Sequence, residues 1–158
     1  GYYQVTQKNG LRFSAKKAYL QPARKRPNLQ IITHAHVTKI SLAGKRADGV
    51  HYSQHGKPHH IKAGREVILS AGAIQSPQIL ELSGIGRPDH LRHHGVDIQH
   101  ELSGVGSHLT DHYISRLSWR LQRSISLNSR AHGLGLAAEI LRYGLTRRGL
   151  LSLSLIHI

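Results

Sequence analysis

The side chains most able to do chemistry in this sequence are its fourteen histidines, because it contains no cysteine and only eight carboxylates. A histidine can act as a general base or bind a metal ion near neutral pH. His108 and His112 stand four residues apart, and His93 and His94 are adjacent. A four-residue spacing puts two rings on one helical face, but Asp111 is the only carboxylate beside that pair. The pattern therefore favours surface histidines over a metal site.

Two glycine-rich runs could form phosphate-binding turns. Residues 133–138, GLGLAA, match the letters of a dinucleotide fingerprint, whose glycines let the backbone approach a pyrophosphate at a helix N-terminus. No predicted strand precedes this run, and Leu153 stands about twenty residues on, where an acid would bind the ribose. Residues 104–109, GVGSHL, lack the third small residue. Neither run is therefore interpreted as a phosphate loop.

Charge is the strongest feature of the composition. The 22 Lys and Arg against 8 Asp and Glu give a net charge of +14, which suits an anionic ligand, an acidic membrane surface or nucleic acid. The densest basic runs are Lys16–Lys17, Arg24–Arg26 and Arg147–Arg148, but the few aromatic residues do not interleave with them as stacking platforms would. Nucleic-acid binding is therefore kept as an alternative from a different class, and it predicts salt-dependent retention on DNA.

Length and composition set the scale of the structure. A chain of 158 residues with 39% hydrophobic residues corresponds to about one folded domain. The sequence has no apolar run long enough to span a membrane, and it does not begin with an export signal. It contains no methionine and opens at Gly1 within structured sequence, so we expect an internal fragment. We expect residues 153–158 to be read-through from a sequencing-library adapter.

The elements that must position any site begin with a short helix and continue as strands. Ser14 is expected to cap a helix over residues 15–20, which Pro22 closes. Short runs rich in Val, Ile, Thr and Tyr then predict strands at 29–33, 35–42, 49–54, 59–63 and 66–71. Turn residues separate them, so we expect an antiparallel meander. The last strand is apolar without alternation and should be buried on both faces.

Helices are expected to dominate the rest of the chain. Ser76 as N-cap and Pro77 as first residue predict a helix over 76–82. Further elements are a helix over 88–94, a strand over 96–102, an extended stretch over 113–121, and a helix over 134–145 that ends by Gly149. That last helix has an apolar stripe formed by Leu134, Ala138, Leu141 and Leu145. We expect this stripe to pack against another element.

Residues 72–86 carry a motif of fixed small, hydroxyl and proline positions, GAIQSPQILELSGIG. This run resembles the second signature of the glucose-methanol-choline (GMC) family of flavin oxidoreductases. The likeness extends over residues 2–150, through the segments 14–20, 26–29, 104–112, 126–128 and 143–149. The sequence is most similar to choline-dehydrogenase-like and alcohol-dehydrogenase-like bacterial members of the family.

The resemblance implies a mixed α/β fold, made from the central part of a glutathione-reductase-type FAD-binding domain with a β-meander. We accordingly expect residues 1–112 to be the middle of that domain and residues 113–152 to begin an antiparallel-sheet substrate domain. The family binds the FAD pyrophosphate on an N-terminal G-x-G-x-x-G turn and uses a base histidine near the C-terminus. Neither motif is matched in this sequence, so we assign no catalytic residue and no metal ligand.

FAD is the cofactor that the resemblance implies, and Val37, Ala71, Gly72 and Ser76 are implied to lie beside it. Val37 would offer its backbone N–H and C=O to the adenine ring. Ala71 and Gly72 would let the backbone approach the cofactor closely, and the helix starting near Ser76 would bring its positive end. From the residues alone, Val37 is equally a core strand position, and Gly72 and Ser76 are equally a turn and a cap.

The implied activity of the parent protein is an FAD-dependent alcohol or choline-type dehydrogenase. A histidine would accept the hydroxyl proton while hydride passes from carbon to the flavin. A small-molecule alcohol is the expected substrate, with oxygen or a quinone as electron acceptor. A non-redox lyase that retains FAD is the alternative on the same scaffold. We expect the fragment alone to be inactive and prone to aggregate, and the parent to be cytoplasmic or peripherally bound to a bacterial inner membrane.

Overall fold

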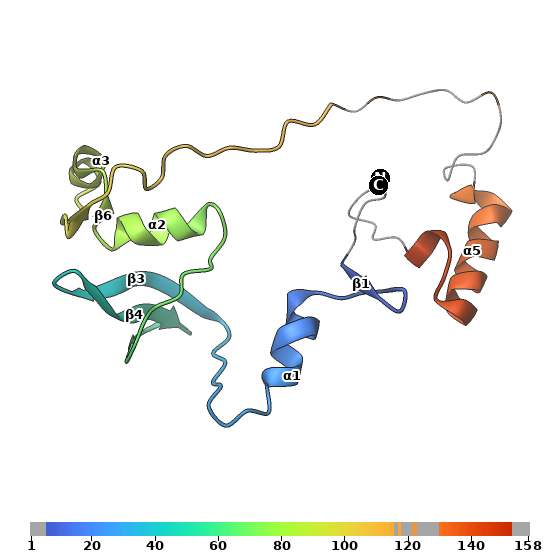
Figure 1. The fold of residues 1–158 in the computed structure, drawn as a ribbon, viewed down its shortest axis with the longest axis horizontal. Coiled ribbons are helices and arrows are strands. Elements are labelled where there is room, and N and C mark those ends of the chain that lie inside the picture. Colours follow the sequence, from blue (N-terminus) through green and yellow to red (C-terminus); the bar gives the residue numbers. More distant parts are fainter. Residues whose placement is uncertain (1–5, 116, 118–121, 123–129, 153–158) are drawn as a thin grey trace. The chain divides into compact units, whose positions relative to one another are not determined.

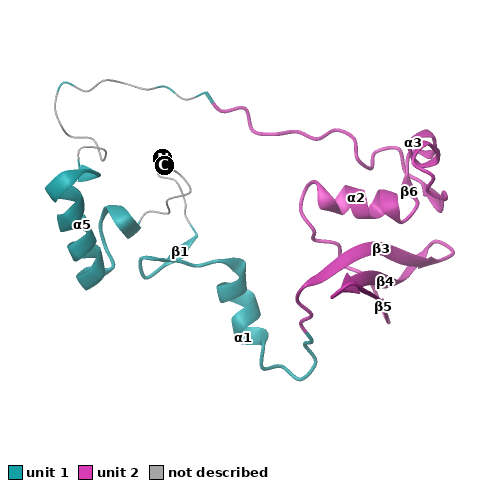
Figure 2. Cartoon of the chain, turned by 180° about the vertical axis from the view of Figure 1, so that it is seen from behind, with its two compact units in different colours: residues 1–30, 115–158 teal, residues 31–114 magenta. Residues whose placement is uncertain are grey.

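The computed structural model describes residues 6–115, 117, 122 and 130–152, and Figure 1 shows the elements that they form. The chain divides into two compact units, one of residues 31–114 and one of residues 1–30 with 115–158 (Figure 2). The expected adapter read-through and the segment 126–128 lie outside the described residues, as does most of the second half of the predicted extended stretch 113–121.

An antiparallel β-meander is the centre of the unit 31–114. Its three strands, in sheet order, are β3 (Ala35–Ala43), β4 (Arg46–Gln54) and β5 (Lys57–Lys62). His55 and Gly56 join β4 to β5, and both have positive φ, 52° and 75°, which matches the twist of a tight hairpin. The predicted meander is confirmed, together with three of its predicted strands.

Helix α2 (Gln75–Leu82) packs against β3 and carries the family-like motif over the sheet (Figure 1). Strand β6 (Ile85–Gly86), helix α3 (Pro88–His93) and strand β7 (His100–Glu101) follow α2 in that order. The strands β6 and β7 pair in parallel. The buried apolar side chains in this unit are Ile40, Ile79 and Leu91. The core of the unit is therefore the seam between β3, α2 and α3.

The other unit contains a two-stranded hairpin, short helical turns and one longer helix. These elements are β1 (Gln7–Lys8), β2 (Leu11–Arg12), the π-helical turn η1 (Lys16–Leu20), α1 (Gln21–Ala23), α5 (Gly133–Thr146) and the 3₁₀ turn η2 (Leu150–Ser152). In the described ranges no helix is both long enough and apolar enough to cross a bilayer.

Helix α5 forms where the sequence predicts it, but its faces are reversed. Leu134, Leu141 and Leu145 are 90%, 65% and 78% exposed, whereas Glu139 is buried at 7%. The carboxylate turns inward because it accepts a hydrogen bond from the Leu150 backbone N–H and lies beside two arginines. No described element of this chain packs on the apolar stripe, so the expected packing partner stays a prediction.

Several elements of the described structure differ from the sequence predictions. No strand forms at 29–33 or 66–71 among the described residues, and the strand predicted over 96–102 shortens to β7. The short N-terminal helix runs on through Pro22 and begins without a side-chain cap from Ser14. Helix α5 ends at Arg147 in the left-handed conformation, two residues before Gly149. The differences at 29–33, 66–71 and 96–102 concern strands, which depend on partners elsewhere in the sequence that a local pattern does not show.

Candidate functional site

The turn that leads into α2 brings three of the four predicted cofactor residues together. The backbone N–H of Ala71 donates to Ser76 Oγ at 3.1 Å, and the N–H of Ser76 donates to the Gly72 carbonyl at 3.1 Å. Gly72 has a φ of 95°, which a residue with a side chain adopts only under strain. Ser76 is thus the second residue of α2 rather than its N-cap, and its hydroxyl closes the turn back onto Ala71.

A groove of about 700 Å³ runs beside this turn, between the start of α2 and the segment 104–110. Small residues line much of it, including Ala73, Ser76, Gly104, Gly106 and Ser107. Gly106 has a φ of 71°, and the Glu81 carboxylate occupies the space where a side chain at position 106 would lie. The groove therefore needs glycine at this wall, and its size is in the range of sites for small ligands.

The acid in the groove wall has a histidine beside it. Glu81 Oε1 lies 3.7 Å from Nε2 of His90, and their side chains are 25% and 41% exposed. The pair joins α2 to α3, and it becomes a charged pair when the histidine is protonated. Sequence reasoning assigned no role to Glu81, because its position in the motif does not show that its side chain faces segment 104–108.

Ser83 connects α2 to the meander. Its hydroxyl accepts a hydrogen bond from the Ile40 backbone N–H at 2.8 Å and donates to the carbonyl of Ile79. The residue is only 6% exposed, so the pairing is shielded from water. Sequence reasoning assigned Ser83 only to the end of the helix, yet it fixes α2 on the edge of β3.

Gly84 completes the end of α2 and explains the glycine in the motif. It has a φ of 80°, and a Cβ built there would overlap the carbonyl oxygen of Asp97. The Gly84 carbonyl accepts hydrogen bonds from the N–H groups of Gln99 and His100. The chain leading to β7 therefore lies directly against this glycine.

Val37, the fourth predicted cofactor residue, is half-buried on β3 opposite Tyr52. The ladder between β3 and β4 slips between Val37 and Lys39, so one residue bulges there. The Ile40 N–H points away from β4, toward Ser83. Backbone groups alternate sides along a strand, and the bulge after Val37 shifts this alternation by one residue. The backbone groups of Val37 therefore point away from β4 as well. Within the described residues β3 pairs with no strand other than β4.

The histidines of the meander form local contacts. His51 and His60 stack with ring centroids 4.4 Å apart, and Ser41 Oγ lies 3.0 Å from His60 Nε2. Partial burial, with the positive charges of His60 and Lys39 nearby, lowers the pKa of His51 below its ordinary value of 6.5. Among the described residues no three His, Asp or Glu side chains are arranged to hold a metal ion.

Solved structures with the same arrangement belong to the class of FAD-dependent oxidoreductases. An FAD-dependent oxidoreductase from Chaetomium thermophilum superposes with a TM-score of 0.76 and 26% identity, covering 91% of this chain and 26% of that one. A formate oxidase superposes with a TM-score of 0.70 and 26% identity, covering 82% of this chain and 23% of that one. The expected mixed α/β fold with antiparallel strands is thereby confirmed.

Sequence comparison gives the family. A family model described as GMC oxidoreductase matches residues 1–114. Oxygen-dependent choline dehydrogenase 1 of Chromohalobacter salexigens is 46% identical over 124 residues, 78% of this chain and 22% of the relative. An alcohol dehydrogenase (acceptor) of Pseudomonas putida is 46% identical over 114 residues, 71% of this chain and 21% of the relative. The chain belongs to the GMC oxidoreductase family, and FAD is the cofactor of its class.

The chain spans 22% and 21% of the length of these two curated relatives. The motif of residues 72–86 lies within the matched region, as do all four predicted cofactor residues. Their individual contacts with FAD stay predictions, and so does the expected boundary between domains at residues 112 and 113.

Proposed function

We propose that the full-length protein oxidises the CH–OH group of a small alcohol, choline or a choline-like alcohol being the first candidates. The relatives named as choline and alcohol dehydrogenases support this substrate class. The observation that carries the proposal is the motif turn itself, where Gly72, Ser76 and Ala71 fold tightly beside a groove walled by glycines. Such a wall suits close approach of a flat, phosphate-bearing cofactor.

The described residues fit part of an FAD molecule in two places. At the groove, the Ser76 N–H already donates to the Gly72 carbonyl, so the contribution of α2 is the positive end of its dipole, which favours a phosphate or an electron-rich ring edge. At the edge of β3, Val37 offers a backbone N–H and C=O that can pair with an adenine edge. We therefore assign Val37, Ala71, Gly72 and Ser76 to holding the cofactor.

The role of the chain's own residues would be to hold and orient the cofactor. Ser76 keeps the turn at Ala71 closed, and Ser83 holds α2 on β3, so the two proposed contact regions keep a fixed separation. When bound, FAD supplies the hydride acceptor that no amino-acid side chain provides. The base that takes the hydroxyl proton is not assigned to any of the fourteen histidines here, because none lies in a motif that carries that role.

The electron acceptor is proposed to be oxygen or a quinone, and the cell compartment to be the cytoplasm or the inner face of a bacterial inner membrane. The basic charge of +14 supports contact with an anionic membrane, where a quinone would be within reach. A lyase that keeps FAD without redox turnover is the alternative reaction on this scaffold.

Anaerobic titration of the purified full-length protein with choline and simple primary alcohols tests the proposal. We expect a bound-flavin absorbance that bleaches on addition of the substrate. A flavin that never bleaches, together with cleavage of a cyanohydrin, would contradict the oxidation and support the lyase reaction instead.

Variants at the groove test the cofactor contacts. Gly106→Val should lower the flavin content, because its side chain would displace the Glu81 carboxylate into the groove. Gly64→Ala is the matched control, since a Cβ at position 64 meets no neighbouring atom and its φ is not positive. Equal flavin content in the wild type and Gly106→Val would contradict the assignment of this groove to FAD.

A further inference from the structure

Glu81 is the one carboxylate among the described residues that line the groove. It belongs to the last turn of α2, where the negative end of the helix dipole disfavours an acid. Its side chain is nevertheless only 25% exposed. A residue that breaks a local rule in this way points to a role that the rest of the fold sets.

Two glycines leave the space that this side chain fills. At Gly86, which is buried, a Cβ would lie 3.3 Å from Glu81 Cγ. At Gly106 a Cβ would lie 2.5 Å from Glu81 Oε1 and 3.2 Å from its Cδ. The Glu81 side chain therefore runs from strand β6, over the first glycine, to the loop of residues 103–108, where its carboxylate covers the second.

The loop 103–108 depends on this contact for its place beside α2. Its start is fixed where the Leu102 N–H donates to the Gly86 carbonyl at 3.0 Å. Among the described residues, the further hydrogen bonds of the loop stay within it or reach back to Leu102. Gly106 and His108 have φ values of 71° and 60°, and a left-handed histidine keeps that shape only where its surroundings hold it. Side-chain packing, rather than backbone pairing, must therefore hold the loop on the helix.

The shape of Glu81 matters more to this contact than its charge. His90 Nε2 lies 3.7 Å from Glu81 Oε1, and the histidine side chain is 41% exposed. An ion pair this open to water contributes little, because water screens it. The contact with Gly106, by contrast, needs a side chain of this length that ends in a flat group with an oxygen.

We propose that Glu81 is a positioning residue for the cofactor, because it seats the loop 103–108 on α2 and so sets the width of the groove. Residues of α2 and of this loop line opposite walls, so a displaced loop changes the space in which the cofactor would lie. A bound group loses affinity when the walls that hold it are no longer fixed. The identity of the ligand rests on the proposed function, whereas the seating of the loop does not.

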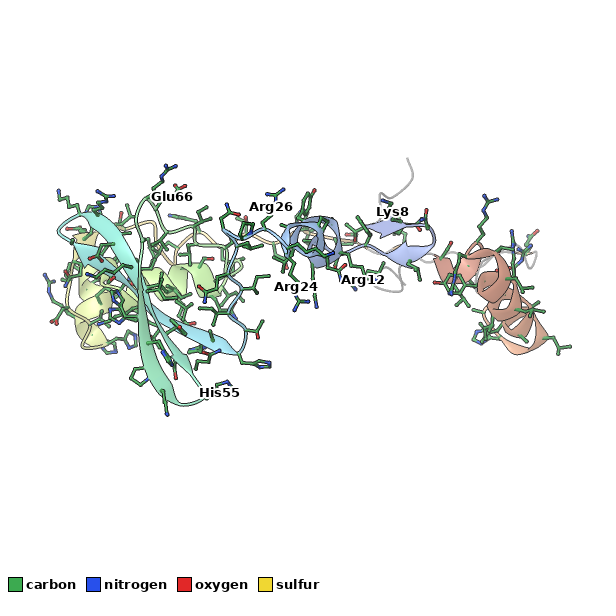
Figure 3. All side chains as sticks on the ribbon, turned by 90° about the horizontal axis from the view of Figure 1, so that it is seen from below. Lys8, Arg12, Arg24, Arg26, His55 and Glu66 are labelled. Carbon is green, nitrogen blue, oxygen red and sulfur yellow. The ribbon has the colours of Figure 1, made fainter. Side chains whose placement is uncertain are left out.

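Hydrogen exchange and FAD affinity of the full-length protein test the proposal. In Glu81→Ala we expect the loop amides to exchange about tenfold faster, with and without flavin, and the dissociation constant for FAD to rise about tenfold. Strand β4, which leads to His55 at the far tip of its hairpin (Figure 3), is the internal reference because it is paired on both sides. Its exchange should stay unchanged, which separates a displaced loop from a destabilised unit.

Two further variants separate shape from charge and this position from others. Glu81→Gln keeps the length and an oxygen over Gly106, so it should restore loop exchange and FAD affinity to within about twofold of the wild type. Glu101→Ala removes an exposed acid from β7, the strand that leads into the loop, and should leave both at wild-type values. A Glu81→Gln variant as impaired as Glu81→Ala would overturn the proposal, because the charge pair with His90 would then carry the effect.

The contact itself is tested by Gly106→Ala, alone and combined with Glu81→Ala. Alone, the new methyl group displaces the carboxylate and adds strain at a positive φ. The double variant should exchange its loop amides within about twofold of Gly106→Ala alone, since the seat is already lost, and rates that multiply would overturn the contact. A wild type that binds flavin, with wild-type loop exchange in Glu81→Ala, would overturn the role of Glu81 alone. A wild type that takes up no flavin would overturn the proposed function, and the cofactor role of Glu81 with it.

Discussion

The hydrogen bond from the Ile40 N–H to Ser83 Oγ is the sharpest test of how this chain is held together. It joins residues 43 positions apart, at 2.8 Å, between the edge of β3 and the end of α2. Replacing Ser83 with alanine removes the acceptor and leaves the Ile40 N–H facing a methyl group. Both residues are more than 90% buried, so water does not readily take the place of the hydroxyl.

The expected cost follows from these two facts. A net hydrogen bond contributes about 1 kcal/mol, and a buried donor left unpaired costs about 1–3 kcal/mol, so we expect the Ser83→Ala variant to lose about 2 kcal/mol. Since about 1.4 kcal/mol is a factor of ten, the Ile40 amide should exchange with solvent about thirtyfold faster. The same loosening should lower the affinity for FAD, because β3 and the start of α2 carry the proposed contacts.

Hydrogen exchange of the full-length protein, read at the peptide that contains β3, measures this effect directly. Ser41→Ala is the matched control, because it removes an exposed hydroxyl from the same strand, 3.0 Å from His60 Nε2. That change should cost less than about 0.5 kcal/mol. The reasoning fails if Ile40 exchanges at the wild-type rate in Ser83→Ala, or if Ser41→Ala accelerates it equally.

Three further predictions concern stability. Gly84→Ala should cost about 3 kcal/mol or more, since both φ and space are unfavourable, whereas Gly56→Ala, with positive φ but open surroundings, should cost about 1 kcal/mol in urea unfolding. The lowered pKa of His51 means that acidification protonates the unfolded chain first, so stability should fall as pH drops through 6.5 toward the folded-state pKa. His51→Asn should flatten that slope, and an unchanged slope would contradict it. Glu139→Ala should loosen α5 by about 2 kcal/mol, and Glu139→Gln by less, because the amide oxygen still accepts from the Leu150 N–H; exchange of the α5 amides measures both.

The helices could be predicted because their signals are local. Pro88 at the start of α3 and the positive φ of Gly95 after it lie within a few residues of the ends that they define. The same holds for the tight turn between β4 and β5. The boundaries of α2, α3 and α5 shifted by only one residue; α2, for example, begins at Gln75 rather than Ser76.

The sequence predicted only the part of the site whose residues are close to one another along the chain. Ala71, Gly72 and Ser76 are joined by hydrogen bonds within one turn, so the motif could place them together. Ser83 and Glu81 act through residues far away in sequence, Ile40 in one case and the loop at Gly106 in the other. Such partners follow from packing, which a single sequence does not encode as a pattern.

The segment 66–71 shows the same limit from the other side and leads to a last prediction. Its apolar residues predict a strand buried on both faces, yet Ile68 is 78% exposed and no strand pairs with it among the described residues. A helix satisfies its own backbone groups, whereas a strand must find both neighbours elsewhere.

We therefore expect amides 66–70 to be protected from hydrogen exchange in the full-length protein and to exchange rapidly in the 158-residue chain alone. Ile68→Lys should then destabilise the full-length protein by several kcal/mol while leaving the chain alone nearly unaffected, because only a buried strand excludes the charge. Rapid exchange of these amides in both proteins would show that the apolar run is not a central strand and that its pattern has another cause.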